Sequence, residues 1–304
     1  MTDSAHALSF HEGTDVGRLD EQVWLLDVQD RVPGIQYLRE WSRAALNLRP
    51  GERVLDVGSG TGTEVLAAAE RVGVTGESVG IDPNPGMIEL ARKRAANPAD
   101  AGYSEEVAGY SEEEARYREG VPGYRKAGAG YVDRGLVSFV TGSAYRLPFP
   151  DGSFDAVRCE RVYQHLEEPG VATDEILRVL RPGGRVVLID TDWYTAIVHP
   201  ADPVILLALH DFMLAGIPNP AAGRRLRGLL ASAGGVIDST QAVAGVWEPA
   251  QFRPPYAELS RRAEAAGAIS AAQRARFLAD LDAGVAADDY HVSVTLAAVL
   301  AHKP

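Results

Sequence analysis

Short apolar runs alternate with helix-like stretches through much of this chain. We predict buried strands at residues 54–57, 79–82, 137–140, 156–159 and 185–190. Helical periodicity separates several of these runs and is clearest at residues 64–71 and 173–180. Strands that alternate with helices of this length imply parallel pairing. The pattern therefore predicts an α/β fold with a doubly wound, mostly parallel sheet.

The two ends of the chain depart from this rhythm. Residues 1–48 contain two helical segments that we expect to cover the functional site. The C-terminal part adds two more strands, at residues 236–246 and 291–296, which bring the sheet to seven. It also adds helices at residues 205–213, 226–233, 255–266 and 270–283. No linker is rich enough in glycine, proline or serine to separate two domains. We therefore predict a single domain over residues 1–304.

Residues 100–135 form an insertion before the third strand and contain a short internal repeat. Tyrosine recurs every seven residues, at positions 103, 110, 117, 124 and 131. A seven-residue step keeps side chains on one helical stripe, although the glycines and Pro122 oppose one continuous helix. Tyrosine is enriched at protein contacts, so we favour a subunit contact, such as a homo-oligomer, over a lid. An expanded surface insertion is the remaining alternative.

The composition narrows the class of protein. The net charge of −12 and the isoelectric point near 5.1 argue against a nucleic-acid partner, because phosphate backbones attract basic surfaces. Cys159 is the single cysteine, so no internal disulfide can form. No signal-peptide-like segment opens the chain, and no apolar run approaches the roughly 18 residues of a membrane span. We expect a cytoplasmic protein without membrane contact.

The rest of the chain is arranged around one glycine-rich turn, Val54-Leu55-Asp56-Val57-Gly58-Ser59-Gly60-Thr61-Gly62. Glycine lets the backbone approach a ligand closely, in dihedrals that a Cβ would forbid. Such a turn also leaves the N–H groups at the start of the following helix open to a bound molecule. The alternative is an αβ turn whose glycines serve the fold alone.

The spacing of these glycines narrows the chemical class of the ligand. A dinucleotide-binding turn has its third glycine one residue later, where this chain has Thr63. The chain also lacks the Gly-Lys-Ser or Gly-Lys-Thr of a nucleotide phosphate loop. We therefore expect a nucleoside without a pyrophosphate. Asp82 is placed to accept hydrogen bonds from both ribose hydroxyls, and Asp56 would face an amino group rather than a phosphate.

These motifs resemble those of the class I S-adenosylmethionine-dependent methyltransferases. The glycine-rich turn is similar to motif I of that family, and Gly80-Ile81-Asp82 resembles its ribose-binding acid. The segments 147–155 and 180–184 resemble the lead into its fourth and fifth strands. His165-Leu166 matches a pair common in the subgroup resembling ubiquinone and menaquinone methyltransferases. The resemblance implies the Rossmann-like methyltransferase fold.

The resemblance implies S-adenosylmethionine as the cofactor and assigns the glycine-rich turn to it by position. Gly58, Gly60 and Gly62 would pass close to the methionine part of the cofactor. Asp56 would lie near its amine, and Asp82 would hold the ribose.

The same resemblance assigns residues around the adenine. Pro83 and Met87 would flank the ring, and Ser143 and Ala144 stand where the family binds the adenine edge. Many members have an aspartate at the position of Ser143, to accept a hydrogen bond from the exocyclic amine. In this chain the serine hydroxyl or the backbone would substitute.

The resemblance also implies which residues surround the sulfonium and the acceptor. Glu160 would lie near the sulfonium, and Gln29 would close over the methionine carboxylate from the N-terminal helices. A small-molecule acceptor is expected between these helices and the loops after the fourth and fifth strands. We expect residues 196–288 to shape its pocket.

The candidate catalytic residues follow the fourth strand. The cofactor carries its own leaving group, so the protein supplies an in-line approach, exclusion of water and, for some acceptors, a base. His165 is the candidate base, with Tyr163 in the same loop. The alternative for His165 is a neutral side chain satisfied at a helix start, and His210 is expected in the core. The sequence shows no metal-ligand spacing such as His-x-x-x-His, so we predict no metal.

Two functions from different classes remain open. The favoured one is methyl transfer from S-adenosylmethionine to an oxygen, nitrogen or carbon atom of a metabolite. The alternative is a protein of the same fold that binds the cofactor without methylating, as a cyclase or a binding module.

Overall fold

The computed structural model describes residues 19–96 and 136–304, and its centre is a seven-stranded sheet. The strands are β1 (Arg53–Val57), β2 (Glu77–Asp82), β3 (Leu136–Thr141), β4 (Phe154–Glu160), β5 (Leu180–His199), β6 (Val236–Val246) and β7 (His291–His302). Their order is β3-β2-β1-β4-β5-β7-β6. Strands β1 to β5 pair in parallel, and β7 lies antiparallel between β5 and β6. The predicted mostly parallel seven-stranded sheet is confirmed.

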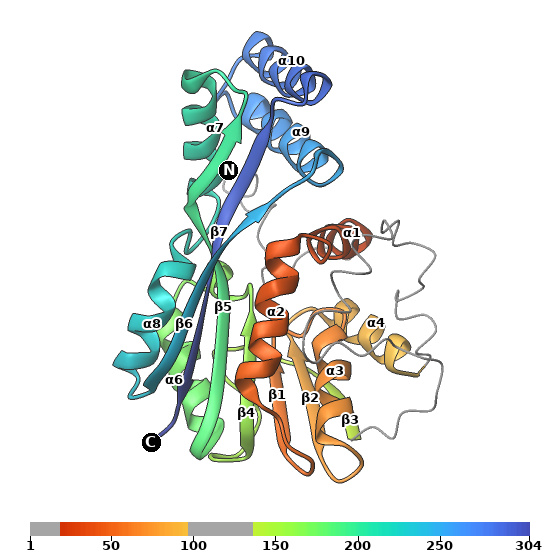
Figure 1. Cartoon of the computed structure of the whole chain (residues 1–304), viewed down its shortest axis with the longest axis vertical. Helices are drawn as coiled ribbons and strands as arrows, with labels where there is room; N and C mark the ends of the chain where they lie inside the picture. The colour runs from red at the N-terminus through yellow and green to blue at the C-terminus, as the bar shows by residue number, and fades with distance from the viewer. Residues whose placement is uncertain (1–18, 97–135) are drawn as a thin grey trace.

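Helices cover both faces of the sheet, as a doubly wound fold requires (Figure 1). On one face, α6 (Pro169–Val179) and α8 (Ala222–Ser232) bury Ile176 and Leu226 against Leu55. On the other face, α2 (Pro33–Leu46) buries Leu38 against Val54, and α3 (Thr63–Val72) and α4 (Pro85–Ala96) form a neighbouring apolar cluster. Successive residues of a strand point to opposite faces, so Asp56 shares the α2 face with Val54.

The central strands bring their carboxyl ends to one edge of the sheet. In β1, Val57 is in register with Ile81 of β2 and with Cys159 of β4. The chain then turns at Gly58, whose N–H donates to the Ile81 carbonyl at 2.7 Å. The glycine-rich turn is therefore held directly beside the ends of β2 and β4.

The N-terminal helices lie close to this edge. Helix α1 (Leu19–Gln29) and helix α2 are separated by a short turn, and Pro33 occupies the first turn of α2, where its fixed φ suits a helix start. Figure 1 shows α1 above the carboxyl end of β1, next to the upper end of α2. The predicted pair of helices is present, in the predicted order.

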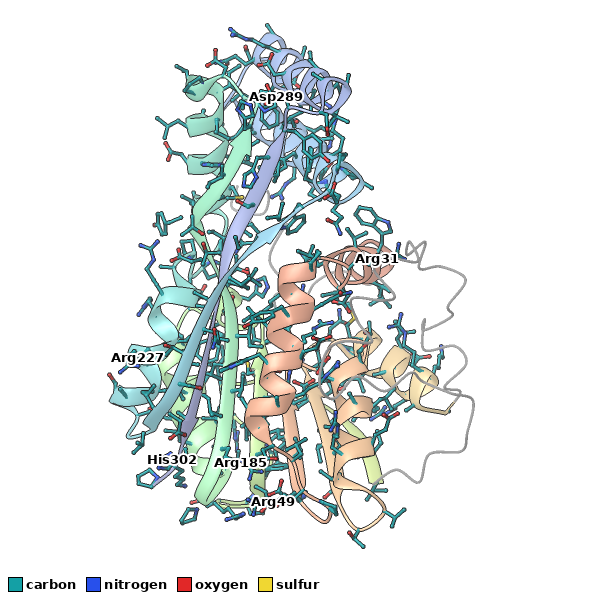
Figure 2. All side chains as sticks on the ribbon, viewed as in Figure 1. Arg31, Arg49, Arg185, Arg227, Asp289 and His302 are labelled. Atoms are coloured by element: carbon teal, nitrogen blue, oxygen red, sulfur yellow. The ribbon has the colours of Figure 1, made fainter. Side chains whose placement is uncertain are left out.

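Strands β5 and β7 continue past the parallel sheet and carry a helical cap. The pairing reaches His199 of β5 opposite His291 of β7, and helices α7 (Pro203–Ala215), α9 (Pro249–Ala265) and α10 (Ala271–Ala287) gather at that end (Figure 1). Leu209, Phe252 and Phe277 are fully buried in the core of the cap. Side chains of Arg185 and His302 lie at the opposite edge of the sheet, whereas Asp289 lies at the tip of the cap (Figure 2).

Several element boundaries differ from the predicted ones. β5 was expected over 185–190 and β7 over 291–296, but both extend because they pair with each other along most of their length. Helix α6 begins at Pro169 rather than 173, and α9 begins at Pro249 rather than 255. Proline fits the first turn of a helix, yet α9 also contains Pro254 and Pro255 in its interior. A local pattern does not show antiparallel pairing between segments so distant in sequence.

Two further expectations concern the chain as a whole. In the described ranges, no helix combines the length and apolarity that crossing a bilayer demands. Residues 1–18 and 97–135 lie outside the described residues, so the tyrosine repeat at 103–131 and its proposed subunit contact stay predictions from the sequence.

Candidate functional site

A cavity of about 440 Å³ opens at the carboxyl edge of the sheet. Its walls come from the glycine-rich turn, the ends of β2 and β4, helix α1 and the cap. Open α/β sheets bind ligands at this edge, just outside the ends of their strands. Of the predicted site residues, ten of the cofactor-binding set and His165 line the cavity, whereas Gly62 and Tyr163 do not.

The three glycines of the turn serve two different purposes. Each has a positive φ, of 73° at Gly58, 49° at Gly60 and 83° at Gly62, which L side chains rarely adopt. A Cβ on Gly58 would come within 2.2 Å of Val162, and one on Gly62 within 2.8 Å of Phe139. Gly58 and Gly60 line the cavity. Gly62 lies at the start of α3 and fits that helix against β3, so its predicted place beside the cofactor is not supported.

Asp82, at the end of β2, presents a partly satisfied carboxylate to the cavity. One oxygen accepts from the Gly60 N–H and the other from the Asn84 N–H, both at 2.9 Å. A carboxylate has about four acceptor positions, so each oxygen keeps one for a ligand. This geometry suits two neighbouring hydroxyls, as a ribose offers. Burial raises the pKa of Asp82, and its two backbone hydrogen bonds work against that shift.

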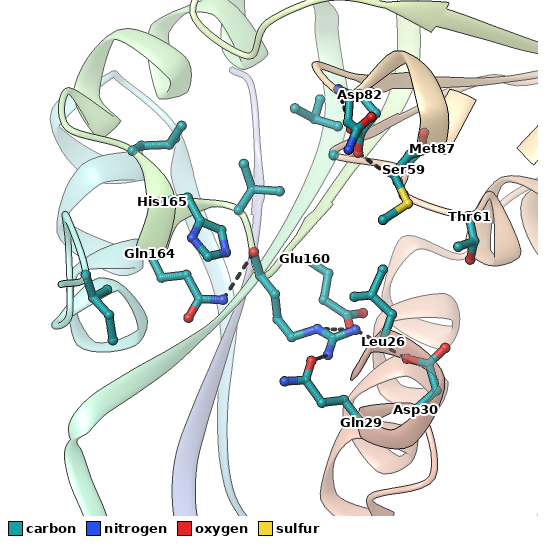
Figure 3. A pocket seen from close by; sticks show the side chains of 18 of the residues that line it. Leu26, Gln29, Asp30, Ser59, Thr61, Asp82, Met87, Glu160, Gln164 and His165 are labelled. Atoms are coloured by element: carbon teal, nitrogen blue, oxygen red, sulfur yellow. Dashed lines mark hydrogen bonds and ion pairs between the residues drawn. The ribbon is translucent and has the colours of Figure 1, made fainter. Parts of the chain in front are cut away.

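Ser59 gives a second sign that a polar ligand belongs here. Its hydroxyl is buried beside the cavity and has no hydrogen-bond partner among the described residues. A buried polar group without a partner is costly, and a bound molecule would satisfy it. Figure 3 shows Ser59, Asp82 and Met87 together on one side of the cavity.

The predicted adenine pocket is assembled from two segments. Pro83 and Met87 follow β2, Ser143 and Ala144 follow β3, and all four line the cavity. Met87 is 2% exposed and forms part of a closed wall. The Ser143 hydroxyl accepts from the Tyr145 N–H at 3.3 Å, which leaves it free to contact a ligand as well.

Glu160, at the end of β4, is the centre of a buried ion-pair network. Its carboxylate accepts from Arg39 Nε at 3.1 Å, lies 3.1 Å from Arg161 Nε, and also accepts from Arg158. Burial alone would raise the pKa of Glu160, but Arg39, Arg158 and Arg161 outweigh it and hold the pKa well below its usual range. Glu160 therefore stays ionised at the cavity wall.

The same network reaches Asp56 and Glu64 behind the glycine-rich turn. Arg158 Nη1 lies 3.5 Å from Asp56, and Arg43 Nε donates to Glu64 at 3.0 Å. Burial raises the pKa of Asp56 to about 7; Arg158 acts against this shift, and the nearby carboxylates of Glu64 and Glu160 add to it. For Glu64 burial also acts upward, but Arg158, Arg43 and Arg39 lower the pKa below its usual value.

Two residues of the α1–α2 segment are tied into this network. Gln29 Oε1 accepts from Arg161, and Asp30 lies 2.8 Å from Arg39 Nη2 and 3.3 Å from Arg161 Nη2. Gln29 lines the cavity at its predicted place on the N-terminal helices. Figure 3 shows Gln29, Asp30 and Leu26 along the lower side of the cavity. The segment that carries α1 is thus fastened to the end of β4 by charge.

Sequence reasoning missed the arginines that bind these acids. Arg158 lies inside the apolar strand β4 and is in register with Asp56 of β1, so a charged pair within two buried strands was the available signal. Arg39 and Arg43 are one turn apart on α2 and carried no comparable signal. Arg161 has a φ of 56°, a left-handed conformation that is uncommon outside glycine and that clusters at functional sites.

His165 lines the cavity at the end of a short turn after β4. The 3-10 helix η4 (Tyr163–His165) places His165 and Gln164 opposite Asp82 and Ser59 (Figure 3). Gln164 donates to the Arg161 carbonyl at 3.2 Å and accepts from Trp193 Nε1 at 2.5 Å. Gln164 therefore links Arg161 of the ion-pair network to Trp193, which lines the cavity on the side of the helical cap.

The structure does not bring Tyr163 to the cavity. Its side chain is fully buried in the core, and its hydroxyl lies 3.0 Å from Thr173 Oγ1. Burial raises the pKa of Tyr163 well above its usual value. The predicted catalytic role of Tyr163 therefore has no geometric support. His210, on α7, also lies away from the cavity, and burial lowers its pKa.

The described part of the chain offers no cluster of three His, Cys, Asp or Glu side chains arranged for a metal ion.

Comparisons with known proteins fit this site. Residues 48–106 and 122–188 match two family models, each described as a methyltransferase domain. The chain is 30% identical to an uncharacterized 37.1 kDa protein in transposon TN4556 of Streptomyces fradiae, over 99% of this chain and 79% of that one. It is 32% identical to the ubiquinone/menaquinone biosynthesis C-methyltransferase UbiE of Ectopseudomonas mendocina, over 59% of this chain. It spans 56% of that enzyme's length.

Solved structures agree on the fold. The YcgJ protein from Bacillus subtilis superimposes with a TM-score of 0.52 at 19% sequence identity, over 88% of this chain and 99% of that one. The matched segments contain the glycine-rich turn, Asp82 and Glu160. The chain belongs to the class I S-adenosylmethionine-dependent methyltransferases, and it resembles their ubiquinone and menaquinone methyltransferases.

Proposed function

We propose that this protein transfers a methyl group from S-adenosylmethionine to a small-molecule acceptor bound beneath the cap. The observation that carries the proposal is that one continuous cavity joins two unlike surfaces. The glycine-rich turn and Asp82 line it on one side, and uncharged residues of the cap line it on the other. Cofactor and acceptor would meet where β4 ends, between Glu160 and His165.

The residues present fit the cofactor. Asp82 has two free acceptor positions for the ribose hydroxyls, and Pro83 and Met87 offer apolar surface to the adenine. Gly58 and Gly60 leave room for the methionine part, and Asp56 would face its amine. When bound, S-adenosylmethionine supplies an electrophilic methyl group on a sulfonium with a neutral leaving group.

The protein's own contribution would be positioning, exclusion of water and proton transfer. Arg39 and Arg161 fasten the α1–α2 segment beside the cavity through Asp30, and this segment would keep water from the reacting atoms. Holding the two reactants in line removes much of the entropic cost of their encounter. His165, on the cavity wall opposite Asp82, would take the proton of a hydroxyl, enol or amine acceptor.

Incubation with methyl-labelled S-adenosylmethionine and a set of phenol, enol and amine acceptors tests the proposal. We expect label in one acceptor class and an equal amount of S-adenosylhomocysteine. Calorimetry on the same sample measures cofactor binding independently. Binding without transfer to any acceptor would favour a protein that uses the cofactor site without methylating, and would overturn the proposed reaction.

A further inference from the structure

The part of the cavity under the cap differs from the cofactor side in its chemistry. We call it the cap chamber and define it as the cavity lining from Trp193 onward in the sequence. Among residues 19–96 and 136–304, none that lines the cap chamber is charged. Four are aromatic, namely Trp193, Trp247, Phe252 and Tyr256, and almost all others are aliphatic. The cofactor side of the same cavity contains nine charged lining residues, Asp30, Arg39, Asp56, Glu64, Asp82, Arg158, Glu160, Arg161 and Glu167.

The aromatic walls of the cap chamber come from separate elements. Trp193 is on β5, Trp247 follows β6, and Phe252 and Tyr256 are on α9. Phe252 is fully buried, and the Tyr256 ring packs 5.9 Å from that of Phe277 in the cap core. These rings are fixed by packing. Rigid aromatic walls favour flat, apolar molecules, because stacking and edge contacts add to the burial of apolar area.

Tyr256 adds one polar group to these apolar walls. Its hydroxyl makes no hydrogen bond to any described residue, while Tyr290 on the same cap donates to Glu248 at 2.8 Å. Burial raises the pKa of Tyr256, so its phenol stays protonated and can donate. Tyr256 is half-buried and lines the cavity, so a ligand oxygen beside it can accept a hydrogen bond from this phenol.

The two sides of the cavity are joined at Trp193. Its indole N–H donates to Gln164 at 2.5 Å, and its backbone N–H donates to the Pro220 carbonyl at 2.9 Å. Gln164 is the neighbour of His165 in the η4 turn. A molecule in the cap chamber would therefore extend from Tyr256 on α9 towards His165.

We propose that the cap chamber selects a neutral acceptor with a flat ring system, oriented by a hydrogen bond from the Tyr256 hydroxyl to an oxygen remote from the reacting atom. The proposal rests on the proposed methyl transfer for its role as acceptor site. A carboxylate, phosphate or ammonium in the chamber would lose its hydration without gaining a countercharge from the described lining. Acceptors that are charged in the part entering the chamber are thereby excluded.

Calorimetry with three probes of one shape tests this selectivity on the complete protein without cofactor. The probes are 1,5-dihydroxynaphthalene, the charged 5-hydroxy-1-naphthoate and the apolar 1,5-dimethylnaphthalene. We expect the dihydroxy compound to bind at least tenfold more tightly than the naphthoate. Equal or tighter binding of the naphthoate would overturn the claim of a neutral acceptor.

The Tyr256→Phe variant tests the orienting hydrogen bond, and Tyr290→Phe is the matched control on the same cap. Tyr256→Phe should weaken the dihydroxy compound about threefold to tenfold and leave the dimethyl compound unchanged. Tyr290→Phe should change neither. If Tyr256→Phe affects both probes equally, or neither, the hydroxyl does not orient the ligand and that part of the inference is wrong.

Titration with S-adenosylmethionine separates this inference from the proposed function. If the probes bind selectively and the cofactor binds normally but no acceptor is methylated, the proposed reaction is wrong and the selectivity of the cap chamber is supported. If a charged acceptor is methylated and the probes bind without selectivity, the proposed reaction is supported and the selectivity of the cap chamber is wrong.

Discussion

The two sides of the cavity are built in opposite ways. The cofactor side is held by backbone turns and by a buried network in which Arg39, Arg158 and Arg161 surround Glu160. The cap chamber is held by apolar packing on β5, β7 and α9, and no described residue of its lining is charged. Ion pairs need defined geometry to offset desolvation, whereas apolar packing tolerates exchange of one side chain for another of similar volume.

This difference implies that the two sides of the cavity tolerate amino-acid substitutions to different extents. A cofactor site fixed by charge and by glycines at positive φ admits few substitutions, since a Cβ at Gly58 would meet Val162 at 2.2 Å. The cap chamber can be reshaped by side-chain exchange without disturbing the parallel sheet. One fold can thereby keep one cofactor and serve many acceptors.

The largest expected effect tests whether charge holds the cofactor side together. Glu160→Gln removes one negative charge and leaves three arginines in a buried site with too few partners. We expect the free energy of unfolding to fall by about 3–5 kcal/mol, measured by chemical denaturation. Glu89→Gln, which removes an exposed pair with Lys93 on α4, is the control and should have no measurable effect. Equal stability of both variants would show that the network does not anchor the site.

The second largest effect concerns His165, which is proposed to lie where the cofactor side meets the cap chamber. If His165 accepts a proton from the acceptor, His165→Gln should lower kcat about 100-fold or more while the affinity for S-adenosylmethionine stays the same. His210→Gln is the matched control, because His210 lies away from the cavity. Steady-state kinetics with calorimetry separates the two quantities. A change in KM alone, with kcat preserved, would assign His165 to acceptor binding instead.

Removal of the ribose contact tests the cofactor side alone. Asp82→Ala deletes two charge-assisted hydrogen bonds, each worth about 1.5–3 kcal/mol before relaxation, so the affinity for S-adenosylmethionine should fall at least tenfold. Asp82→Asn keeps one acceptor oxygen, so its affinity for S-adenosylmethionine should lie between those of Asp82→Ala and the unsubstituted protein. Binding of the chamber probes should not change in either variant. Unchanged cofactor affinity in Asp82→Ala would remove the ribose assignment.

The cofactor side could be predicted from the sequence because its determinants are local. Gly58, Gly60 and Asp82 belong to short motifs, and the backbone of each motif is set by residues within a few positions. The strands β1 to β4 were predicted within a few residues, since apolar runs in a parallel sheet are continuous and short. Gly62 and Tyr163 do not line the cavity, because a motif position does not say whether a residue faces a ligand or the core.

The cap chamber could not be predicted in the same way. Its walls come from β5, α9 and the residue after β6, which meet only when β5 and β7 pair beyond the parallel sheet. The expectation that residues 196–288 shape the acceptor pocket named a region, and the aromatic residues within it carried no shared motif. Pairing over about 100 residues of sequence depends on the tertiary fold rather than on local propensity.

The smallest effect tests Asp56, a cavity-lining acid whose pKa lies near neutral pH. Burial raises the pKa of Asp56 to about 7, whereas Glu64, Glu160 and Arg158, which also face it, stay charged at neutral pH. Asp56 therefore binds a proton in the folded protein over a range where the unfolded chain has lost it. The contribution of Asp56 to stability without cofactor should fall as the pH rises from about 4 to 7, and the buried Asp190, whose pKa is also raised to about 7, adds a change of the same sign.

Cofactor binding should reverse the sign of this dependence. A cationic amine beside Asp56 favours the ionised carboxylate, so binding below pH 7 must release a proton from it. The affinity for S-adenosylmethionine should then rise up to about tenfold between pH 6 and pH 8, measured by calorimetry. Titration of the cofactor's own amino group is common to all variants, so the difference from Asp56→Asn isolates this carboxyl. If both proteins give the same pH profile, Asp56 does not face the amine, and the charged side of the cavity binds the cofactor through its other residues.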